Sequence, residues 1–417
     1  MDKFIVFGGN RLEGEVQVSG AKNAVLPLMA ASLLAEGNTR IDNVPSLVDV
    51  HTMRRLIQEM GVKAEYEGGV VNIDTSSLDN QEAPYDLVRK MRASVLVLGP
   101  LVARFGKARV SLPGGCAIGA RPIDLHLKGL QKLGAKIELK AGYIEAQADR
   151  LKGASIRFEK PTVGGTQNMM MAASLAEGRT LIENAAREPE IVDLANFINK
   201  MGGKIQGAGD SLMIIDGVDS LTPVHYRVMA DRIEAGTLLA AGVITRGDVF
   251  VKDCPVDAMG LVLDKFRAMG ANLEIKEDGV RVQMEGPIES IDFRTQPHPG
   301  YPTDMQAQMM ALMSVASGRS AVSETVFENR FMHVSELRRM GADIICEGPM
   351  AVIRGKEYLQ GAPVMATDLR ASACLVLAGL VSKGVTEIRR IYHLDRGYDR
   401  IEVKLQRVGA NIKRLRS

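Results

Sequence analysis

One glycine-rich segment of this 417-residue chain places a cysteine where it could do chemistry. In LPGGCAIGARPIDLH (residues 112–126), the run Pro113-Gly114-Gly115 predicts a turn that exposes Cys116, and Arg121 follows five residues later. A nearby guanidinium favours the thiolate form of a cysteine. Such a thiol can act as a nucleophile or as a general acid. A lone cysteine is more often a small buried residue, but the flanking glycines favour exposure here.

A lysine and an asparagine open the first apolar helical segment of the chain. Lys22 and Asn23 stand at the start of this segment in SGAKNAVLPLMAA. A helix N-terminus offers unpaired N–H groups and the positive end of the helix dipole, and the lysine adds a full charge. The pattern therefore suits a phosphate or carboxylate. Taken alone, it would equally suit a solvated lysine in a turn.

Three arginines recur at informative places. Arg92 and Arg370 hold the same position in the repeated tetrapeptides MRAS and LRAS, each at the start of an apolar helical segment, and Arg396 precedes a glycine in YHLDRGYDRIE. Arginine is the natural bidentate partner of phosphate and carboxylate groups. Each could be a surface ion pair, but the set in both halves of the chain suggests a cleft lined for anions.

Three acidic residues precede apolar helical segments at equivalent places. They are Asp231 in MADRIEAG, Asp304 in YPTDMQAQ and Asp368 in ATDLRAS. Aspartate at such a position usually caps the helix. The alternative for Asp304 is a general base, and the sequence leaves both interpretations open.

Composition narrows the function further. The net charge of +2 argues against a nucleic-acid-binding surface, and the absence of tryptophan makes base-stacking platforms hard to build. The four cysteines are scattered and the six histidines show no metal-ligand spacing, so we expect no metal, no disulfide framework and a cytoplasmic protein. No membrane-spanning run, P-loop or G-x-G-x-x-G motif is present.

The framework for these residues is a sixfold repeat. In each copy a helical segment ends at glycine and a strand follows, at a spacing of about 70 residues. The copies are MGVKAEY (60–66), LGAKIEL (133–139), MGGKIQG (201–207), MGANLEI (269–275), MGADIIC (340–346) and VGANIKR (408–414).

Each repeat also contains a helical segment that is apolar nearly all round, which predicts a buried helix with a left-handed glycine after it. An amphipathic helix and paired strands follow, so the unit is predicted as βαβαββ within an α/β (α+β) fold. Three units make a domain. The predicted domains are residues 21–229, with the Cys116 loop, and residues 1–20 plus 230–417, whose sheet the first strand, KFIVFGG, could complete.

The segments SGAKNAVLP, SLPGGCAIGARPIDLH, NAAREPEIVD, ENRFMHV, MATDLRASA and IYHLDRGYDRIE resemble signatures of a bacterial enolpyruvyl transferase family, the UDP-N-acetylglucosamine 1-carboxyvinyltransferases. The resemblance extends over residues 1–417. It implies two inside-out α/β barrel domains with a cleft between them, and no metal or organic cofactor. It also implies transfer of the enolpyruvyl group of phosphoenolpyruvate to the 3′-hydroxyl of UDP-N-acetylglucosamine, the first committed step of peptidoglycan precursor synthesis.

The resemblance also implies roles for residues. Cys116 donates a proton to phosphoenolpyruvate and can form a covalent adduct with it, and Asp304 takes the proton of the sugar hydroxyl. Lys22, Arg121 and Arg396 are implied to hold the phosphate and carboxylate of phosphoenolpyruvate and to stabilise developing charge, with Lys22 and Arg396 counted among the catalytic residues. Arg92, Arg370 and Asp368 are implied to belong to the same charged, substrate-binding cluster. The positions implied for the nucleotide sugar are Asn23, Arg121, Pro122, Ile123, Asp124, Leu125, Lys160, Pro161, Thr162, Val163, Gly164, Asp304 and Val326.

Further expectations follow from the same resemblance. The Cys116 loop is expected to close as a lid after the nucleotide sugar binds, and a phosphonate epoxide is expected to alkylate Cys116. The protein is expected to be a monomer or weak homo-oligomer. Two alternatives remain: a shikimate 3-phosphate carboxyvinyltransferase, whose family lacks the Pro-Gly-Gly-Cys loop, and a non-catalytic repeat scaffold.

Overall fold

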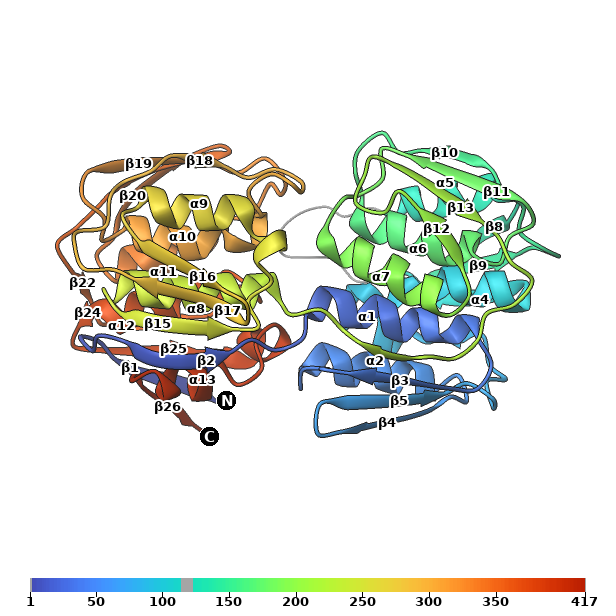
Figure 1. Ribbon diagram of the computed structural model, residues 1–417, viewed down its shortest axis with the longest axis horizontal. Helices are drawn as coiled ribbons and strands as arrows, with labels where there is room; N and C mark the ends of the chain where they lie inside the picture. The colour runs from blue at the N-terminus through green and yellow to red at the C-terminus, as the bar shows by residue number, and fades with distance from the viewer. Residues whose placement is uncertain (1, 114–122, 417) are drawn as a thin grey trace. The chain divides into compact units, whose positions relative to one another are not determined.

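The chain folds into two compact units. The computed structural model describes residues 2–113 and 123–416. Within these, the N-terminal unit comprises residues 20–113 and 123–229, and the C-terminal unit comprises residues 2–19 and 230–416 (Figure 1). No helix of the described residues is long and apolar enough to cross a membrane.

The N-terminal unit contains three repeats. Its helices are α1 (Lys22–Ala31), η1 (Ser32–Leu34), α2 (Val48–Gln58), α3 (Tyr85–Val88), η2 (Arg92–Val97), α4 (Leu98–Phe105), α5 (Asp124–Lys132), α6 (Val163–Ala173) and α7 (Pro189–Lys200). Its strands are β3 (Asn38–Asp42), β4 (Lys63–Glu67), β5 (Val70–Asp74), β6 (Glu82–Ala83), β7 (Lys107–Ser111), β8 (Lys136–Lys140), β9 (Tyr143–Gln147), β10 (Ser155–Arg157), β11 (Arg179–Glu183), β12 (Lys204–Gln206), β13 (Leu212–Asp216) and β14 (His225–Arg227).

The C-terminal unit contains the other three. Its helices are α8 (Arg232–Ile244), η3 (Val256–Ala258), α9 (Gly260–Ala268), η4 (Thr303–Met305), α10 (Gln306–Met313), α11 (Val334–Arg339), α12 (Ser372–Val381), η5 (Ile391–Arg396) and α13 (Ile401–Arg407). Its strands are β1 (Lys3–Phe7), β2 (Glu13–Gln17), β15 (Asp248–Lys252), β16 (Asn272–Lys276), β17 (Gly279–Gln283), β18 (Phe293–Arg294), β19 (Arg319–Ser323), β20 (Asp343–Glu347), β21 (Met350–Arg354), β22 (Leu359–Gln360), β23 (Pro363–Met365), β24 (Ser382–Lys383), β25 (Val385–Arg389) and β26 (Asn411–Leu415).

Each unit builds three four-stranded sheets to one plan. In the sheet β10-β11-β13-β12, the short strand β10 runs parallel to β11, β11 pairs antiparallel with β13, and β13 pairs antiparallel with β12. The same order recurs in the other five sheets, and β22 and β24 form a small separate pair. The predicted βαβαββ repeat is therefore confirmed.

Two short strands pair with a strand that is distant in the sequence instead of with the next strand along the chain. Strand β14 pairs with β3, whereas β2 pairs with β15. Strand β1 fills the third position of the last sheet, between β25 and β26. The first 17 residues thus supply strands to two sheets of the C-terminal unit.

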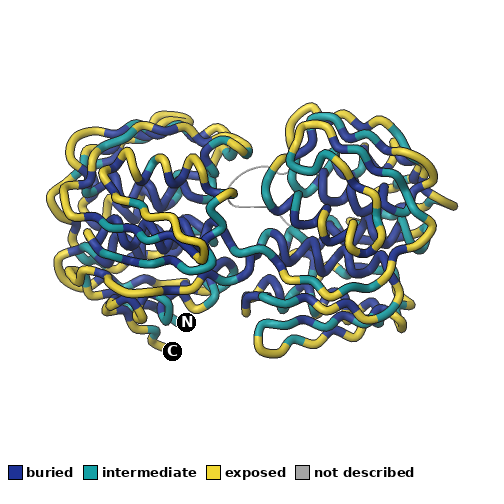
Figure 2. Tube along the Cα trace, in the orientation of Figure 1, coloured by how far each residue is buried: buried dark blue, intermediate teal, exposed yellow. Residues whose placement is uncertain are grey.

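The buried helices predicted from their apolar composition form the core of each unit. Every residue of α8 and α10 is buried, and α8, α10 and α12 contact one another. In the N-terminal unit α4 packs against α6. Figure 2 shows this buried interior and the exposed outer surface of each unit. Within the described residues every sheet is open, so the expected inside-out barrel consists of open sheets packed around helices.

The glycines of the repeat occupy left-handed backbone. All six glycines of the MGVKAEY-type motif have positive φ, between 87° and 103°. Five of the six glycines that follow the buried helices do so too, which confirms the expected helix ends there. The exception is Gly247, where Arg246 adopts the left-handed conformation instead, with φ 52°, so the prediction was displaced by one residue.

Candidate active site

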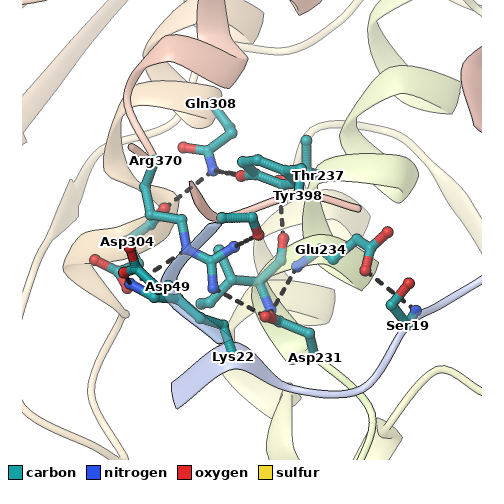
Figure 3. A network of polar contacts seen from close by, with 12 residues as sticks. Ser19, Lys22, Asp49, Asp231, Glu234, Thr237, Asp304, Gln308, Arg370 and Tyr398 are labelled. Atoms are coloured by element: carbon teal, nitrogen blue, oxygen red, sulfur yellow. Dashed lines mark hydrogen bonds and ion pairs between the residues drawn. The ribbon is translucent and has the colours of Figure 1, made fainter. Parts of the chain in front are cut away.

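Arg370 is the centre of a buried cluster in the C-terminal unit. Its side chain is 2 % exposed, and it donates from Nη2 to Asp231 Oδ2 at 2.9 Å and from Nη1 to the carbonyl of Gly397 at 2.9 Å (Figure 3). Its Nε lies 3.9 Å from Asp304 Oδ2. Burial alone would lower the pKa of the guanidinium, but Asp231, Tyr398 and Asp304 outweigh burial and raise the pKa above its ordinary value. Arg370 is therefore a permanent buried cation that orders nearby acids.

Asp231 joins this cation to the start of α8. Its Oδ1 accepts hydrogen bonds from the backbone N–H groups of Ile233 at 2.9 Å and Glu234 at 3.1 Å, so it is an N-cap. Burial alone would raise the pKa of this carboxyl, but Arg370 and the two amides hold its pKa below the ordinary value. Asp231 is therefore a carboxylate at neutral pH, and its expected capping role is confirmed.

Asp304 does not cap a helix, in contrast to the usual role of an aspartate at this place. It lies inside η4, and neither η4 nor α10 has a side-chain cap. Its Oδ1 accepts a hydrogen bond from Arg330 Nη2 at 2.7 Å, and Arg370 lies on its other oxygen. The side chain is 26 % exposed, whereas that of Arg330 is 4 % exposed. Two buried guanidiniums thus hold a carboxylate that still reaches solvent, as a general base requires.

The other predicted residues of this unit have protein partners. Asp368 Oδ1 accepts hydrogen bonds from the backbone N–H groups of Arg370 and Ala371, both at 2.8 Å. The N–H of Val326 donates to Glu324 at 2.8 Å. Arg396 is half-buried at the end of η5, one residue before the Gly397 carbonyl that binds Arg370. Asp304, Asp368, Arg370 and the Arg396 turn are therefore brought together.

In the N-terminal unit, Lys22 is buried against an acid. Its side chain is 10 % exposed, and Nζ lies 3.0 Å from Oδ2 of Asp49, whose side chain is 3 % exposed. The alternative of a solvated lysine is therefore wrong. Ala21, which precedes α1, provides no side-chain cap, so among the described residues no side chain caps the amides of the first turn. Lys22 is the first residue of this helix, and the half-buried Asn23 follows it.

Helices α5 and α6 begin within the segments 123–125 and 160–164 that were predicted for the nucleotide sugar, and the two helices contact each other. Thr162 caps α6 by accepting from the N–H of Gly165 at 3.2 Å. A Cβ atom on Gly164 would lie 3.1 Å from the His126 ring, so glycine permits this close approach. Asp124 opens α5, and Lys160 and Pro161 are exposed.

A cavity of about 420 Å³ adjoins these two segments. Its lining mixes apolar side chains with three cations and one acid. The lining residues are Leu125, Lys128, Gly129, Gln131, Lys132, Ile156, Arg157, Phe158 and Glu159. The lining therefore offers apolar walls and a net positive charge.

His126 connects α5, α6 and η2. Its Nδ1 lies 3.0 Å from Asn168 Nδ2, whose side chain also bonds the backbone of Val95 and Gly99. Burial, and next the charge of Arg92, lower the pKa of His126 to about 4. Burial likewise lowers the pKa of His333 in the C-terminal unit to about 4. Both imidazoles are neutral at pH 7, so His126 accepts the Asn168 amide hydrogen.

These histidines predict loss of stability in weak acid. Their folded-state pKa values lie below the ordinary 6.5, so the unfolded chain binds protons first. The contribution of each neutral imidazole to the free energy of unfolding is fully present above pH 6.5. It is lost as the pH falls towards 4, by about 3 kcal/mol for each residue at the limit. Urea unfolding at pH 7, 5.5 and 4 measures this. His126→Gln should flatten the profile, and a profile unchanged by this replacement would contradict the assignment.

Cys116, Arg121 and Pro122, and the predicted lid, lie outside the described residues. The other three cysteines are free thiols: Cys254 and Cys374 are buried and Cys346 is half-buried. Burial raises the pKa of all three, to about 12 for Cys254. They are therefore poor nucleophiles at neutral pH, as expected for structural cysteines.

Two partners of predicted site residues were not themselves predicted. Asp49 is a buried acid on the apolar side of the amphipathic helix α2, which is the signal that could have found it. Arg330 lies in ENRFMHV, a segment with the resemblance but without an assigned role. Only the structure shows that its guanidinium binds Asp304.

Comparison with known proteins gives consistent matches. The family model described as EPSP synthase (3-phosphoshikimate 1-carboxyvinyltransferase) matches residues 6–405. A UDP-N-acetylglucosamine 1-carboxyvinyltransferase of Desulfatibacillum aliphaticivorans is 58 % identical over 416 residues, covering 100 % of both chains. The solved enolpyruvyl transferase NikO from Streptomyces tendae has a TM-score of 0.90 and 27 % identity, covering 100 % of this chain and 99 % of its own. An EPSP synthase from Acinetobacter baumannii has a TM-score of 0.77 and 18 % identity over 100 % of both chains, and this likeness shows the fold alone.

Proposed function

The chain belongs to the EPSP synthase family of enolpyruvyl transferases, and from this membership we infer that it is a UDP-N-acetylglucosamine 1-carboxyvinyltransferase. It transfers the enolpyruvyl group of phosphoenolpyruvate to the 3′-hydroxyl of UDP-N-acetylglucosamine and releases phosphate. The product is a precursor of peptidoglycan. Full-length identity to enzymes of this name favours this acceptor over shikimate 3-phosphate, since the EPSP synthase structure is much less similar.

The observation that carries the mechanism is the Asp304 carboxylate between two buried guanidiniums. The reaction is an addition followed by an elimination. The sugar oxygen bonds to C2 of phosphoenolpyruvate while C3 gains a proton and the hydroxyl loses one. Loss of a proton from C3 and of phosphate from C2 then restores the double bond. In this scheme Asp304 takes the hydroxyl proton.

Cationic residues are proposed to bind the anionic groups of phosphoenolpyruvate. Lys22 and the first-turn amides of α1 are proposed to bind a phosphate or carboxylate, because Lys22 is the first residue of a helix whose N-terminus has no side-chain cap, and Asp49 fixes the position of its ammonium group. Arg92, Arg121 and Arg396 complete the set. Arg370 and Asp368 are proposed to act mainly on Asp304 and on each other, because Arg370 is buried and bonded to protein groups.

The nucleotide sugar is proposed to bind the paired α5 and α6 segments. The matching positions are those named above, and the neighbouring cavity offers apolar and cationic walls. Thr162 is occupied as a helix cap, so contacts near Pro161 and Thr162 are proposed to use the backbone. Residues 21–229 and residues 1–20 plus 230–417 are proposed as the two domains, in a cytoplasmic protein that is a monomer or weak homo-oligomer.

Cys116 is proposed as the acid that protonates C3, so Cys116→Ala should lower phosphate release by at least 10²-fold. A phosphonate epoxide should alkylate the same thiol, since Cys254, Cys346 and Cys374 have raised pKa values. Peptide mass spectrometry after labelling measures the site. Label on any of these three, or full turnover by Cys116→Ala, would refute the assignment.

A further inference from the structure

A chain of buried hydrogen bonds runs beside the proposed base. Gln308 Nε2 lies 3.1 Å from the hydroxyl of Tyr398, and this hydroxyl lies 3.0 Å from Thr237 Oγ1 (Figure 3). Thr237 in turn donates to the carbonyl of Ile233 at 2.8 Å. Because the threonine proton is used there, the tyrosine proton goes to Thr237 and the amide donates to the tyrosine. The chain therefore has one consistent direction of donation.

Two members of this chain, Gln308 and Tyr398, reach groups of the site. Gln308 Nε2 also donates to the backbone carbonyl of Asp304 at 3.0 Å. Tyr398 directly follows Gly397, whose carbonyl binds Arg370, and the Arg370 guanidinium carbon lies 5.1 Å from the centre of the Tyr398 ring. The ring thus supports the cation that faces Asp231 and Asp304.

The network has no room for a substrate. Tyr398 is 1 % exposed, and Gln308 and Thr237 are equally buried. Burial raises the pKa of Tyr398 to about 12, although Arg370 opposes the shift, so the hydroxyl stays protonated and donates. These residues can affect a reaction only through the groups they hold.

We propose that Tyr398, held by Gln308 and Thr237, is a positioning residue that couples Asp304 to the Arg396–Gly397 turn through Arg370. The proposal rests on the function proposed above. As a consequence, Asp304 and the Arg396–Gly397 turn keep a fixed position relative to each other. Loss of the Tyr398 hydroxyl should therefore affect the chemical step more than the binding of the nucleotide sugar.

The test is Tyr398→Phe, which keeps the ring against Arg370 and removes one donor. We expect kcat to fall about 10- to 50-fold with KM for UDP-N-acetylglucosamine within threefold. In an Asp304→Asn background the same change should have almost no further effect.

A matched control is Tyr226→Phe. The Tyr226 hydroxyl donates to Asp193 at 2.8 Å in the N-terminal unit, so this change also removes a hydrogen bond. Its kcat should stay within twofold of the parent. If Tyr398→Phe changes kcat no more than Tyr226→Phe does, or keeps its effect without the Asp304 carboxylate, the inference is overturned.

Two further arms separate the possible failures. Thr237→Val keeps the tyrosine but removes its hydroxyl partner, and it should lower kcat as Tyr398→Phe does. Thr237→Ser keeps a hydroxyl at this position and should have a kcat close to that of the parent. The test therefore does not depend on one variant folding correctly. The parent enzyme measured beside them tests the proposed function. A parent that releases no phosphate with UDP-N-acetylglucosamine refutes that function, and an active parent with indifferent network variants refutes only the positioning role.

Discussion

Asp304→Asn is expected to lower kcat by about 10²- to 10⁴-fold, the usual contribution of a general base. Asparagine keeps the shape of the side chain and can still accept from Arg330, but its amide cannot take up the proton of the sugar hydroxyl. Phosphate release under saturating substrates measures kcat, and calorimetric titration measures affinity for UDP-N-acetylglucosamine. Affinity should change far less than turnover, because the lost function belongs to the transition state.

The matched control for this variant is Asp248→Asn. Asp248 is also paired with an arginine in the C-terminal unit, at 2.6 Å from Arg281, but no site role is proposed for it. Its kcat should stay within twofold of the parent. Turnover of Asp304→Asn within threefold of the parent would contradict the assignment of Asp304 as the base.

Asp231→Asn is expected to reduce the free energy of unfolding by about 3–5 kcal/mol, because it leaves the buried charge of Arg370 with weaker compensation. Both partners are nearly inaccessible, with side chains 5 % and 2 % exposed. Asparagine caps a helix about as well as aspartate, so the hydrogen bonds to Ile233 and Glu234 are retained. The effect then comes from the contact with Arg370, which loses both the charge and the acceptor at Oδ2. Urea unfolding followed by circular dichroism measures the change.

Two comparisons sharpen that result. The exposed pair Arg179–Asp216 also has short contacts, and Asp216→Asn should reduce the free energy of unfolding far less than Asp231→Asn does, because solvent screens the pair. The double variant Asp231→Asn/Arg370→Met should recover part of the loss, since the buried cation is then absent. A cost for Asp231→Asn no larger than that for Asp216→Asn would show that the buried pair does not stabilise the unit.

Local sequence patterns predicted the repeated architecture well. One glycine follows the amphipathic helix of each repeat, and all six adopt a left-handed backbone conformation that other residues rarely adopt. The apolar composition of α8, α10 and α12 is incompatible with exposure to solvent. Both are properties of a few neighbouring residues. The long-range pairing of β2 and β14 was not predicted in this form, because two short strands carry little information about which distant strand they will join.

In the site, too, local features were predictable from the sequence and long-range pairing was not. Lys22, Asp304 and Arg370 were proposed as site residues from their residue types and their positions at helix starts. Their partners were not, since Asp49 and Arg330 come from other elements and ion pairing depends on the fold. The choice between cap and base for Asp304 was likewise open. It depends on whether the helix begins at the acid, and α10 begins two residues later, at Gln306.

The most direct test of the account measures phosphate release from phosphoenolpyruvate by the purified protein, with UDP-N-acetylglucosamine and, in parallel, with shikimate 3-phosphate. The account predicts release that depends on the nucleotide sugar, is absent with shikimate 3-phosphate, and falls with Asp304→Asn and Cys116→Ala. Release with shikimate 3-phosphate alone would contradict the proposed acceptor, and release with neither would contradict the assignment as an enolpyruvyl transferase.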